Sequence, residues 1–310
     1  MTQTILRTPE SRFTGLPDYP FSPNYHQVTD ALRLHYVDVG PRDVAPVLML
    51  HGEPTWSYLY RRVIPPVAAA GHRVLAPDLV GFGKSDKPAL RQAHTYAGQV
   101  AWIRRWIEAL DLRDITLVCQ DWGSLIGLRL AAESPERFSR IILGNGGLPT
   151  GDTPMPRAFR VWRAFARFSP WFPIGRIVQG GTKRQLTRAE RAAYDAPFPS
   201  VAYKAAARVY PLLVPSVPND PASDANRKAW RALEGWEKPF ICCYSDGDPI
   251  TRGIDRMFKS RVPGTRNQPH TKLHGGHFMQ EDDPETLAEL VIAALASPAT
   301  RVRAASAFQA

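Results

Sequence analysis

The sequence predicts an α/β fold with a mostly parallel central sheet flanked by helices. Short apolar runs alternate with segments of helical periodicity, and such alternation favours a parallel sheet covered on both faces. The contents of hydrophobic residues (44%) and charged residues (22%) are typical of a globular protein. The runs expected to form strands are residues 32–39, 46–50, 73–76, 115–119, 140–143, 240–244 and 271–273.

Two helices are predicted in the first half of the chain. Residues 100–110 carry apolar side chains at the spacing of one helix face, and a second helix is expected over 123–133, directly after a strand. Residues 149–215 break the alternation, because they lack a β-branched run and mix aromatic residues with arginine and proline. We expect a helical insertion lying over the sheet, with the proline-rich residues 211–221 as the return linker. The alanine-rich tail after Ser297 is expected to fray.

The charge and the cysteines limit the classes of function. The net charge is +10, but the arginines are spread along the chain with some density in 156–192, so a solvated surface is a simpler interpretation than nucleic-acid binding. No apolar run of about 18 residues and no secretory signal are present, so neither stable membrane association nor export is expected. Cys119, Cys242 and Cys243 lie in apolar runs without metal-ligand spacing, which indicates buried reduced thiols and a cytoplasmic location.

The strand over 115–119 leads into a sharp turn that carries a candidate nucleophile. Asp121 has a small residue two positions before it (Cys119) and two positions after it (Gly123), and it stands where serine stands in the strand-to-helix elbow of α/β-hydrolases. A helix N-terminal carboxylate is the alternative interpretation of Asp121. Ser124 lies on the first turn of the helix, where capping or packing is expected. An aspartate nucleophile can attack saturated carbon without a base, and the resulting alkyl ester must then be hydrolysed.

Two other strand ends supply the parts that ester hydrolysis needs. His51-Gly52-Glu53-Pro54 follows the strand over 46–50, where one oxyanion-hole N–H is expected. The backbone N–H groups of Glu53 and of Trp122, the residue after the nucleophile, are therefore the expected donors.

A histidine and an acid follow in the order nucleophile, acid, base. His277 is the predicted base, with His274 as its competitor. Asp248, after the strand over 240–244, is predicted to orient the imidazole, whereas Asp246 is expected to be a turn residue.

Several long motifs resemble haloalkane dehalogenases, subfamily I in particular. They are Asp121-Trp122, residues 51–61 (HGEPTWSYLYR), residues 81–88 (GFGKSDKP), Arg7-Thr8-Pro9 with Phe13, and residues 194–199 (YDAPFP). The similarity covers nearly the whole chain apart from its tail, although residues 81–88 alone recur across α/β-hydrolases.

The resemblance implies the domain organisation and a halide site. The core would comprise residues 1–148 and 216–310, and the cap residues 149–215. Trp122 and a cap tryptophan would donate indole N–H bonds to the departing halide, since the indole nitrogen is only a donor. Trp162 is the expected second donor and Trp171 its rival; some subfamily members carry this tryptophan near position 182, where this chain has threonine.

Three other functions are considered. An epoxide hydrolase shares the aspartate nucleophile but needs cap tyrosines as acids, for which Tyr194, Tyr203 and Tyr210 are available. Trp122 and Glu53 favour the dehalogenase. A light-emitting oxygenase and a non-catalytic binding protein on this scaffold are the remaining alternatives, and the second is disfavoured because nucleophile, acid, base and oxyanion loop occur in order.

The expected reaction is hydrolysis of a haloalkane to alcohol and halide through an ester on Asp121. The expected partners are a small halogenated alkane, water and the halide ion, with no metal, organic cofactor or nucleic acid. A monomer is expected.

Overall fold

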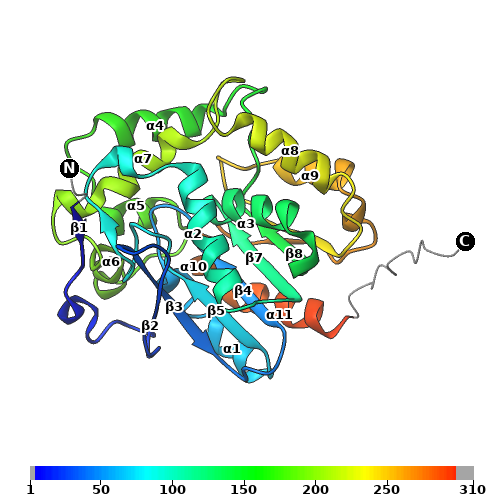
Figure 1. Cartoon of the computed structure of the whole chain (residues 1–310), viewed down its shortest axis with the longest axis horizontal. Coiled ribbons are helices and arrows are strands. Elements are labelled where there is room, and N and C mark those ends of the chain that lie inside the picture. Colours follow the sequence, from blue (N-terminus) through cyan, green and yellow to red (C-terminus); the bar gives the residue numbers. More distant parts are fainter. Residues whose placement is uncertain (1–3, 298–310) are drawn as a thin grey trace, which may run out of the picture.

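The computed structural model describes residues 4–297, and its centre is an eight-stranded sheet in the order β10-β9-β8-β7-β4-β5-β3-β2 (Figure 1). Strand β3 is antiparallel to both of its neighbours, β2 and β5, and all pairs from β5 to β10 are parallel. A separate antiparallel pair joins β1 (Ile5–Leu6) to β6 (Lys87–Pro88). The predicted α/β class with a mostly parallel sheet is confirmed. The strands of the large sheet are β2 (Asn24–Gln27), β3 (Arg33–Val39), β4 (Pro46–Leu50), β5 (Arg73–Pro77), β7 (Ile115–Gln120), β8 (Phe138–Gly144), β9 (Phe240–Ser245) and β10 (Thr271–Leu273).

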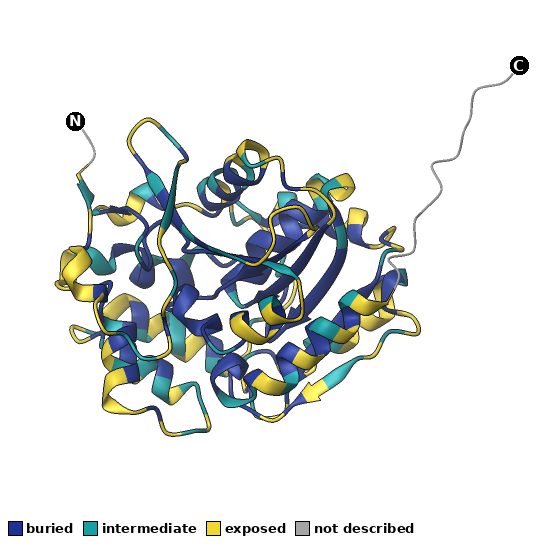
Figure 2. Ribbon diagram, turned by 90° about the horizontal axis from the view of Figure 1, so that it is seen from below, coloured by how far each residue is buried: buried dark blue, intermediate teal, exposed yellow. Residues whose placement is uncertain are grey.

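The apolar runs predict seven of these strands, because central parallel strands are buried on both faces. Every residue of β4, β7 and β9 is buried. Strand β2 was not predicted, since its sequence, Asn-Tyr-His-Gln, is polar and it lies at the edge of the sheet with half-buried side chains. Figure 2 shows this distribution, with buried residues at the sheet and exposed residues on the outer helix faces. The three cysteines are free and buried, as expected.

Helices cover the sheet in groups. Helix α2 packs on α3, and α3 on α8, whereas α1 packs on α11. Thr95 caps α2 by accepting a hydrogen bond from the Gly98 N–H at 3.0 Å, which starts this helix four residues before the predicted segment. No helix within residues 4–297 has the length and apolar character needed to cross a membrane. The helices are α1 (Ile64–Ala69), α2 (Tyr96–Ala109), α3 (Trp122–Glu133), α8 (Ser223–Leu233), α9 (Ile254–Arg261), α10 (Met279–Asp282) and α11 (Pro284–Ala296).

Between β8 and α8 the chain forms only helices and loops, at the upper left of Figure 1. These helices are α4 (Arg157–Phe168), α5 (Ile174–Gly180), α6 (Arg188–Asp195), the short 3-10 helix η5 (Val201–Lys204) and α7 (Ala205–Leu213). Pro211 lies inside α7, so the expectation that the return linker begins at Pro211 was wrong. Its missing N–H removes one helical bond only two residues before the helix ends. The tail after Ser297 lies outside the described residues.

Candidate active site

Asp121 occupies a sharp bend between β7 and α3, with φ 48° and ψ −126°. A non-glycine residue adopts this conformation only where the surrounding structure enforces it. Two glycines packed around this bend leave no space for a side chain. A Cβ on Gly123 would lie 2.1 Å from the Leu50 carbonyl oxygen, and one on Gly52, in the loop after β4, would lie 2.4 Å from the Asp121 Cβ. The close approach of helix, strand and loop therefore holds the carboxylate at the carboxyl edge of the sheet.

The Asp121 carboxylate does not cap its own helix. Its Oδ1 instead accepts a hydrogen bond from the Glu53 backbone N–H at 2.7 Å, and its side chain is 25% exposed. Ser124 lies aside from the carboxylate, with its hydroxyl donating to the carbonyls of Asp121 and Gly147. Asp121 is therefore the N-cap residue of α3, but its carboxylate bonds the Glu53 loop and not its own helix, and the packing interpretation of Ser124 agrees with the geometry.

His277 lies between the two carboxylates that the sequence selects. Its Nδ1 is 3.0 Å from Asp248 Oδ2 and its Nε2 is 3.5 Å from Asp121 Oδ2. Asp248 also accepts hydrogen bonds from the N–H groups of Ile250 and Thr251, at 2.9 and 3.3 Å, and from the Thr251 hydroxyl. These bonds fix the Asp248 carboxylate, and the carboxylate in turn fixes the ring.

The electrostatics of this group follow from burial and charge. Burial alone would lower the pKa of His277, but the negative charges of Asp248 and Asp121 overcome it and raise the pKa from 6.5 to about 10. Burial would raise the pKa of Asp248, and His277 with the hydrogen bonds lowers it to about 2. The two carboxylates therefore favour the protonated form of His277 in the resting protein.

The competing residues lie elsewhere. His274 is largely exposed, and its Nδ1 is 2.9 Å from Asp246 Oδ2. Asp246 also accepts a hydrogen bond from Lys183 Nζ at 2.6 Å. These three residues form a surface ion pair network that contacts neither Asp121 nor His277.

Two amides that the sequence does not single out hold the His277 loop. The Asn145 side-chain amide donates to the carbonyls of Gly276 and His277, at 2.9 and 3.0 Å. The Gln120 amide nitrogen lies 3.2 Å from the His277 carbonyl and 3.1 Å from its Nε2. Asn145 directly follows β8, so its position at a strand end was a usable signal. Gln120 directly follows the predicted strand over 115–119, so the same signal was available for it, although the structure makes it the last residue of β7.

The α5–α6 loop of residues 181–187 and the His277 loop are bonded to each other. Asp282 accepts hydrogen bonds from the N–H groups of Gly276, Lys183 and Arg184, at 2.7, 2.9 and 2.8 Å. The Phe278 N–H donates to the Gly181 carbonyl at 3.2 Å. The backbone on both sides of His277 is thus tied to the α5–α6 loop.

The tryptophans differ in their surroundings. Trp122 is buried, with ring centroids of Tyr210 and Tyr96 at 4.5 and 5.2 Å. Trp162 is half-buried in α4, and its indole lies near the Glu53 carboxyl. Burial, followed by the charge of Asp121, raises the pKa of Glu53 well above its ordinary value, and Trp162 opposes that rise. Trp171 is exposed and stacks on Arg176.

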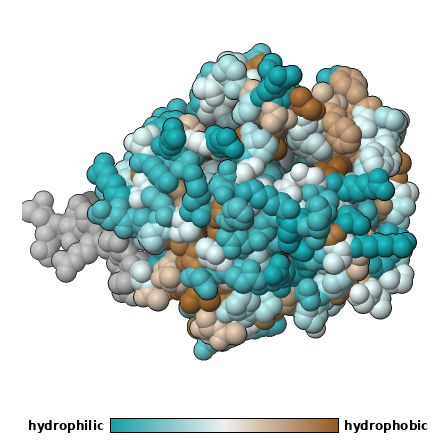
Figure 3. Space-filling model, turned by 180° about the vertical axis from the view of Figure 1, so that it is seen from behind, coloured by the Kyte–Doolittle hydropathy of each residue, from teal (hydrophilic) through white to brown (hydrophobic). Residues whose placement is uncertain are grey.

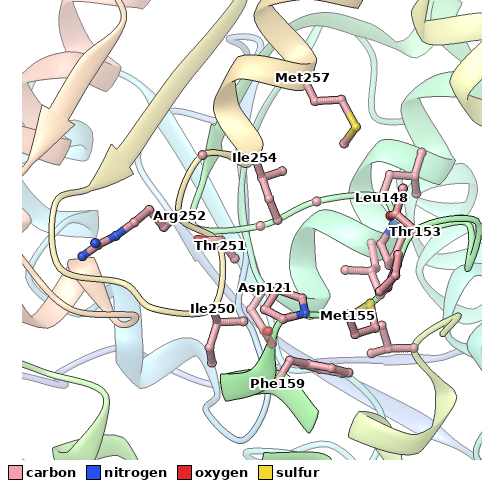
Figure 4. A pocket seen from close by; sticks show the side chains of 18 of the residues that line it. Asp121, Leu148, Thr153, Met155, Phe159, Ile250, Thr251, Arg252, Ile254 and Met257 are labelled. Atoms are coloured by element: carbon pink, nitrogen blue, oxygen red, sulfur yellow. The ribbon is translucent and has the colours of Figure 1, made fainter.

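A cavity of about 420 Å³ opens beside Asp121 and Trp122 (Figure 4). Phe159 of α4 and Met155 lie on one side of the carboxylate, and Ile254 and Met257 of α9 on the other. Arg252 points away from Asp121 in this view. Side chains that surround the nucleophile are thus largely apolar, which suits an uncharged organic molecule.

Comparisons with known proteins agree with the fold and the motifs. The α/β hydrolase fold family matches residues 45–284. The haloalkane dehalogenase of Psychrobacter cryohalolentis is 55% identical over 93% of this chain and 97% of its own length, and that of Mycolicibacterium paratuberculosis is 53% identical over the same shares. The tetrameric structure of haloalkane dehalogenase DpaA from Paraglaciecola agarilytica superposes with a TM-score of 0.86 at 35% identity, covering 96% of this chain and 99% of that one. With a relative this similar over almost the full length of both proteins, the chain belongs to the haloalkane dehalogenase family.

Proposed function

We propose that this chain hydrolyses haloalkanes to alcohols and halide ions, with Asp121 as the nucleophile. One observation carries the proposal. The partly exposed Asp121 carboxylate lines an apolar cavity, and Nε2 of the buried His277 lies 3.5 Å from its Oδ2. A carboxylate oxygen can form a bond to an alkyl carbon while the carbon–halogen electron pair leaves with the halide. The first step therefore needs no base.

The departing halide needs hydrogen-bond donors rather than a proton. Trp122, on the cavity wall directly after the nucleophile, is the proposed first donor, and Trp162 the second. The proximity of Trp162 to the Glu53 carboxyl supports this assignment. The Glu53 backbone N–H bonds the Asp121 carboxylate, so the indole of α4 lies near the nucleophile. Donors aimed at a developing anion in an apolar site stabilise the transition state.

Esterification of Asp121 prepares the second step. The ester is uncharged, so one of the two charges that raise the pKa of His277 is lost. The pKa then falls and the imidazole becomes available as a base, with Asp248 stabilising the proton that it gains. His277 deprotonates water, the resulting hydroxide attacks the Asp121 carbonyl carbon, and the N–H groups of Glu53 and Trp122 stabilise the oxyanion. When this intermediate collapses, the bond from the carbonyl carbon to the alkyl oxygen breaks, and the alcohol leaves with the proton that His277 had taken.

Epoxide hydrolysis is the second candidate, and the cavity disfavours it. No tyrosine is found among the described residues that line the cavity. Tyr194 is buried and donates to Glu281, and Tyr203 donates to the Arg7 carbonyl at 3.4 Å. Tyr210 packs on Trp122, and burial raises its pKa well above the ordinary value, which makes it a poor acid.

Trapping the ester tests the proposal. The His277→Phe variant should complete the first step with 1-bromobutane or 1,2-dibromoethane and accumulate an alkyl adduct on Asp121, detected by mass spectrometry of the digested protein. His274→Phe is the matched control and should turn over without an adduct. An unmodified Asp121 in the His277→Phe variant, with no halide released, would contradict the scheme. Halide release should exceed hydrolysis of styrene oxide in the unmodified protein.

The proposed setting is a cytoplasmic monomer that uses no cofactor. The solved relative from Paraglaciecola agarilytica is a tetramer, so sedimentation velocity at several concentrations is the appropriate check. A concentration-independent mass of one chain is expected.

A further inference from the structure

The outer face of α4 carries positive and apolar side chains without compensating acids. Residues 153–189 contain no aspartate or glutamate. Arg157, Arg160 and Arg167 make no ion pair with any carboxylate among residues 4–297. The basic residues of this segment are Arg157, Arg160, Arg163, Arg167, Arg176, Lys183, Arg184 and Arg188.

The exposed side chains of α4 lie on one face of the helix. Their spacing of three and four residues aligns them along the axis, and the row continues to Trp171 in the next loop. Val161, Phe168 and Trp171 are 63%, 73% and 57% exposed. Figure 3 shows hydrophobic atoms at the upper right edge, the side where α4 lies when Figure 1 is turned around. We name this row the cap stripe; it consists of Arg157, Arg160, Val161, Ala164, Arg167, Phe168 and Trp171.

An ordinary solvated helix face does not need large apolar side chains. Helix α4 already buries Phe159 and Ala166 on its inner face, so its exposed apolar residues are not required for the packing of the cap. Alternation of arginine with aromatic residues is typical of surfaces that rest on a bilayer, where guanidinium groups bond phosphates and rings enter the interface.

The composition of the cap stripe selects among possible partners. A second copy of this face would oppose arginine to arginine, which disfavours a two-fold contact. Nucleic-acid bases need open ring faces, but Arg167 lies over the Phe168 ring at 5.1 Å and Arg176 over the Trp171 ring at 5.4 Å. We infer that the cap stripe docks reversibly on an anionic phospholipid bilayer, which is a surface contact and not a membrane span.

Docking would bring the substrate cavity close to the lipid. Residues 154–156 and Phe159, at the start of α4, line the cavity wall. Haloalkanes are apolar and concentrate in a bilayer. This consequence rests on the proposed function, whereas the binding itself does not. Binding is therefore measured without substrate, so its failure is distinguishable from failure of the dehalogenation scheme.

Vesicle co-sedimentation of the full chain tests the docking. Vesicles of equal parts phosphatidylcholine and phosphatidylglycerol should bind the protein at low salt, and pure phosphatidylcholine vesicles should bind much less. Arg160→Glu/Arg167→Glu should weaken binding by about tenfold or more. The matched control is Arg42→Glu/Arg113→Glu, which makes the same change in net charge. These two arginines lie in the loops before β4 and β7, at the amino ends of the strands, whereas the cavity lies at the carboxyl ends. The control should weaken binding by about twofold at most.

A second variant separates docking from bulk charge attraction. Phe168→Ala/Trp171→Ala keeps the net charge and should also weaken vesicle binding several-fold, while halide release from 1-bromobutane in buffer stays unchanged and verifies the fold. Equal loss in the two charge variants, no effect of the aromatic variant, or equal binding to neutral vesicles would overturn the proposal. So would a cap-stripe-dependent dimer in sedimentation, or an oligonucleotide that binds more tightly than the vesicles.

Discussion

The two halves of the cap are held in place in different ways. The α5–α6 half is bonded to the core through a buried network of charged side chains, whereas the α4 half packs within the cap mainly through aromatic rings. In the first half, buried Arg61 bonds Glu190 of α6 at 2.8 Å and also Glu281, which lies four residues after His277. Arg184 and Tyr194 complete this network by donating to Glu281.

In the α4 half, Trp162 stacks on Phe165 and Phe172, each with centroids 5.7 Å apart. Few polar contacts join this helix to its surroundings; Arg208 donates to the carbonyls of Ala166 and Ser169, and Arg163 to Ser216. Directional bonds hold one arrangement, but stacked rings can slide. The difference indicates that the α5–α6 half fixes the base, while the α4 half sets what enters the cavity.

Removing an arginine that bonds each half should give the largest contrast, and Arg61 of the core is the one that bonds the α5–α6 half. Arg61→Ala leaves Glu281 buried without its cation, and the free energy of unfolding should fall by about 3–5 kcal/mol. Arg163→Ala removes the same residue type from the half-buried α4 surface and should cost about 1 kcal/mol or less. Urea denaturation of both variants measures the difference. Equal losses would mean that the two halves are attached equally.

The link between Asp282 and the His277 loop should affect catalysis more than stability. Asp282→Asn weakens the acceptor for three backbone N–H groups and should slow ester hydrolysis by about tenfold to a hundredfold, because the base shifts from its place. Single-turnover kinetics with 1-bromobutane separates this step from ester formation. If ester formation slows equally, Asp282 supports the fold in general and not the base.

Changes in the α4 half should affect the rate of halide release. Trp162→Phe keeps the stacking on Phe165 and Phe172 but removes the N–H donor, so halide release should slow by about tenfold, more for chloride than for bromide substrates. Trp171→Phe changes an exposed ring and is the control, with activity expected to remain within about twofold. A larger effect of Trp171→Phe would assign the second donor to that residue.

The pH dependence should separate the two chemical steps. His277 must lose its proton before it can act as a base, and its pKa of about 10 in the resting protein falls when Asp121 becomes an uncharged ester. Ester hydrolysis should therefore slow as the pH falls through this lower pKa, whereas ester formation needs no base and should change less. Rapid-quench measurements of both steps across pH would show the difference, and identical profiles would argue against His277 as the base.

The strand ends explain why sequence reasoning reached much of the candidate site. Parallel strands bring their carboxyl ends to one edge, so Asp121 after β7, Asp248 after β9 and His277 after β10 converge although they are far apart in the chain. The roles assigned to these residues, to Glu53 and Trp122, and the cap boundaries 149–215 remain predictions.

Other features depend on packing that the sequence does not encode locally. The contacts of α4 with α7 decide whether Trp162 faces inward, and the path of the loop after α4 decides where Trp171 lies. The polar edge strand β2 has no apolar pattern and forms because β3 offers it a partner. The bond of Gln120 to His277 and that of Lys183 to Asp282 join segments more than 90 residues apart in the chain. The bond of Gly276 to Asp282 spans a tight turn.

The glycines around Asp121 limit how the chain can be altered. Gly52 packs against the Asp121 side chain, so a methyl group there would displace the carboxylate itself, and Gly123 packs against the Leu50 backbone, so a methyl group there would push helix α3 away from β4. Engineering of new substrate ranges should therefore leave the elbow untouched and vary Met155, Phe159 and Met257, whose side chains shape the cavity without supporting Asp121.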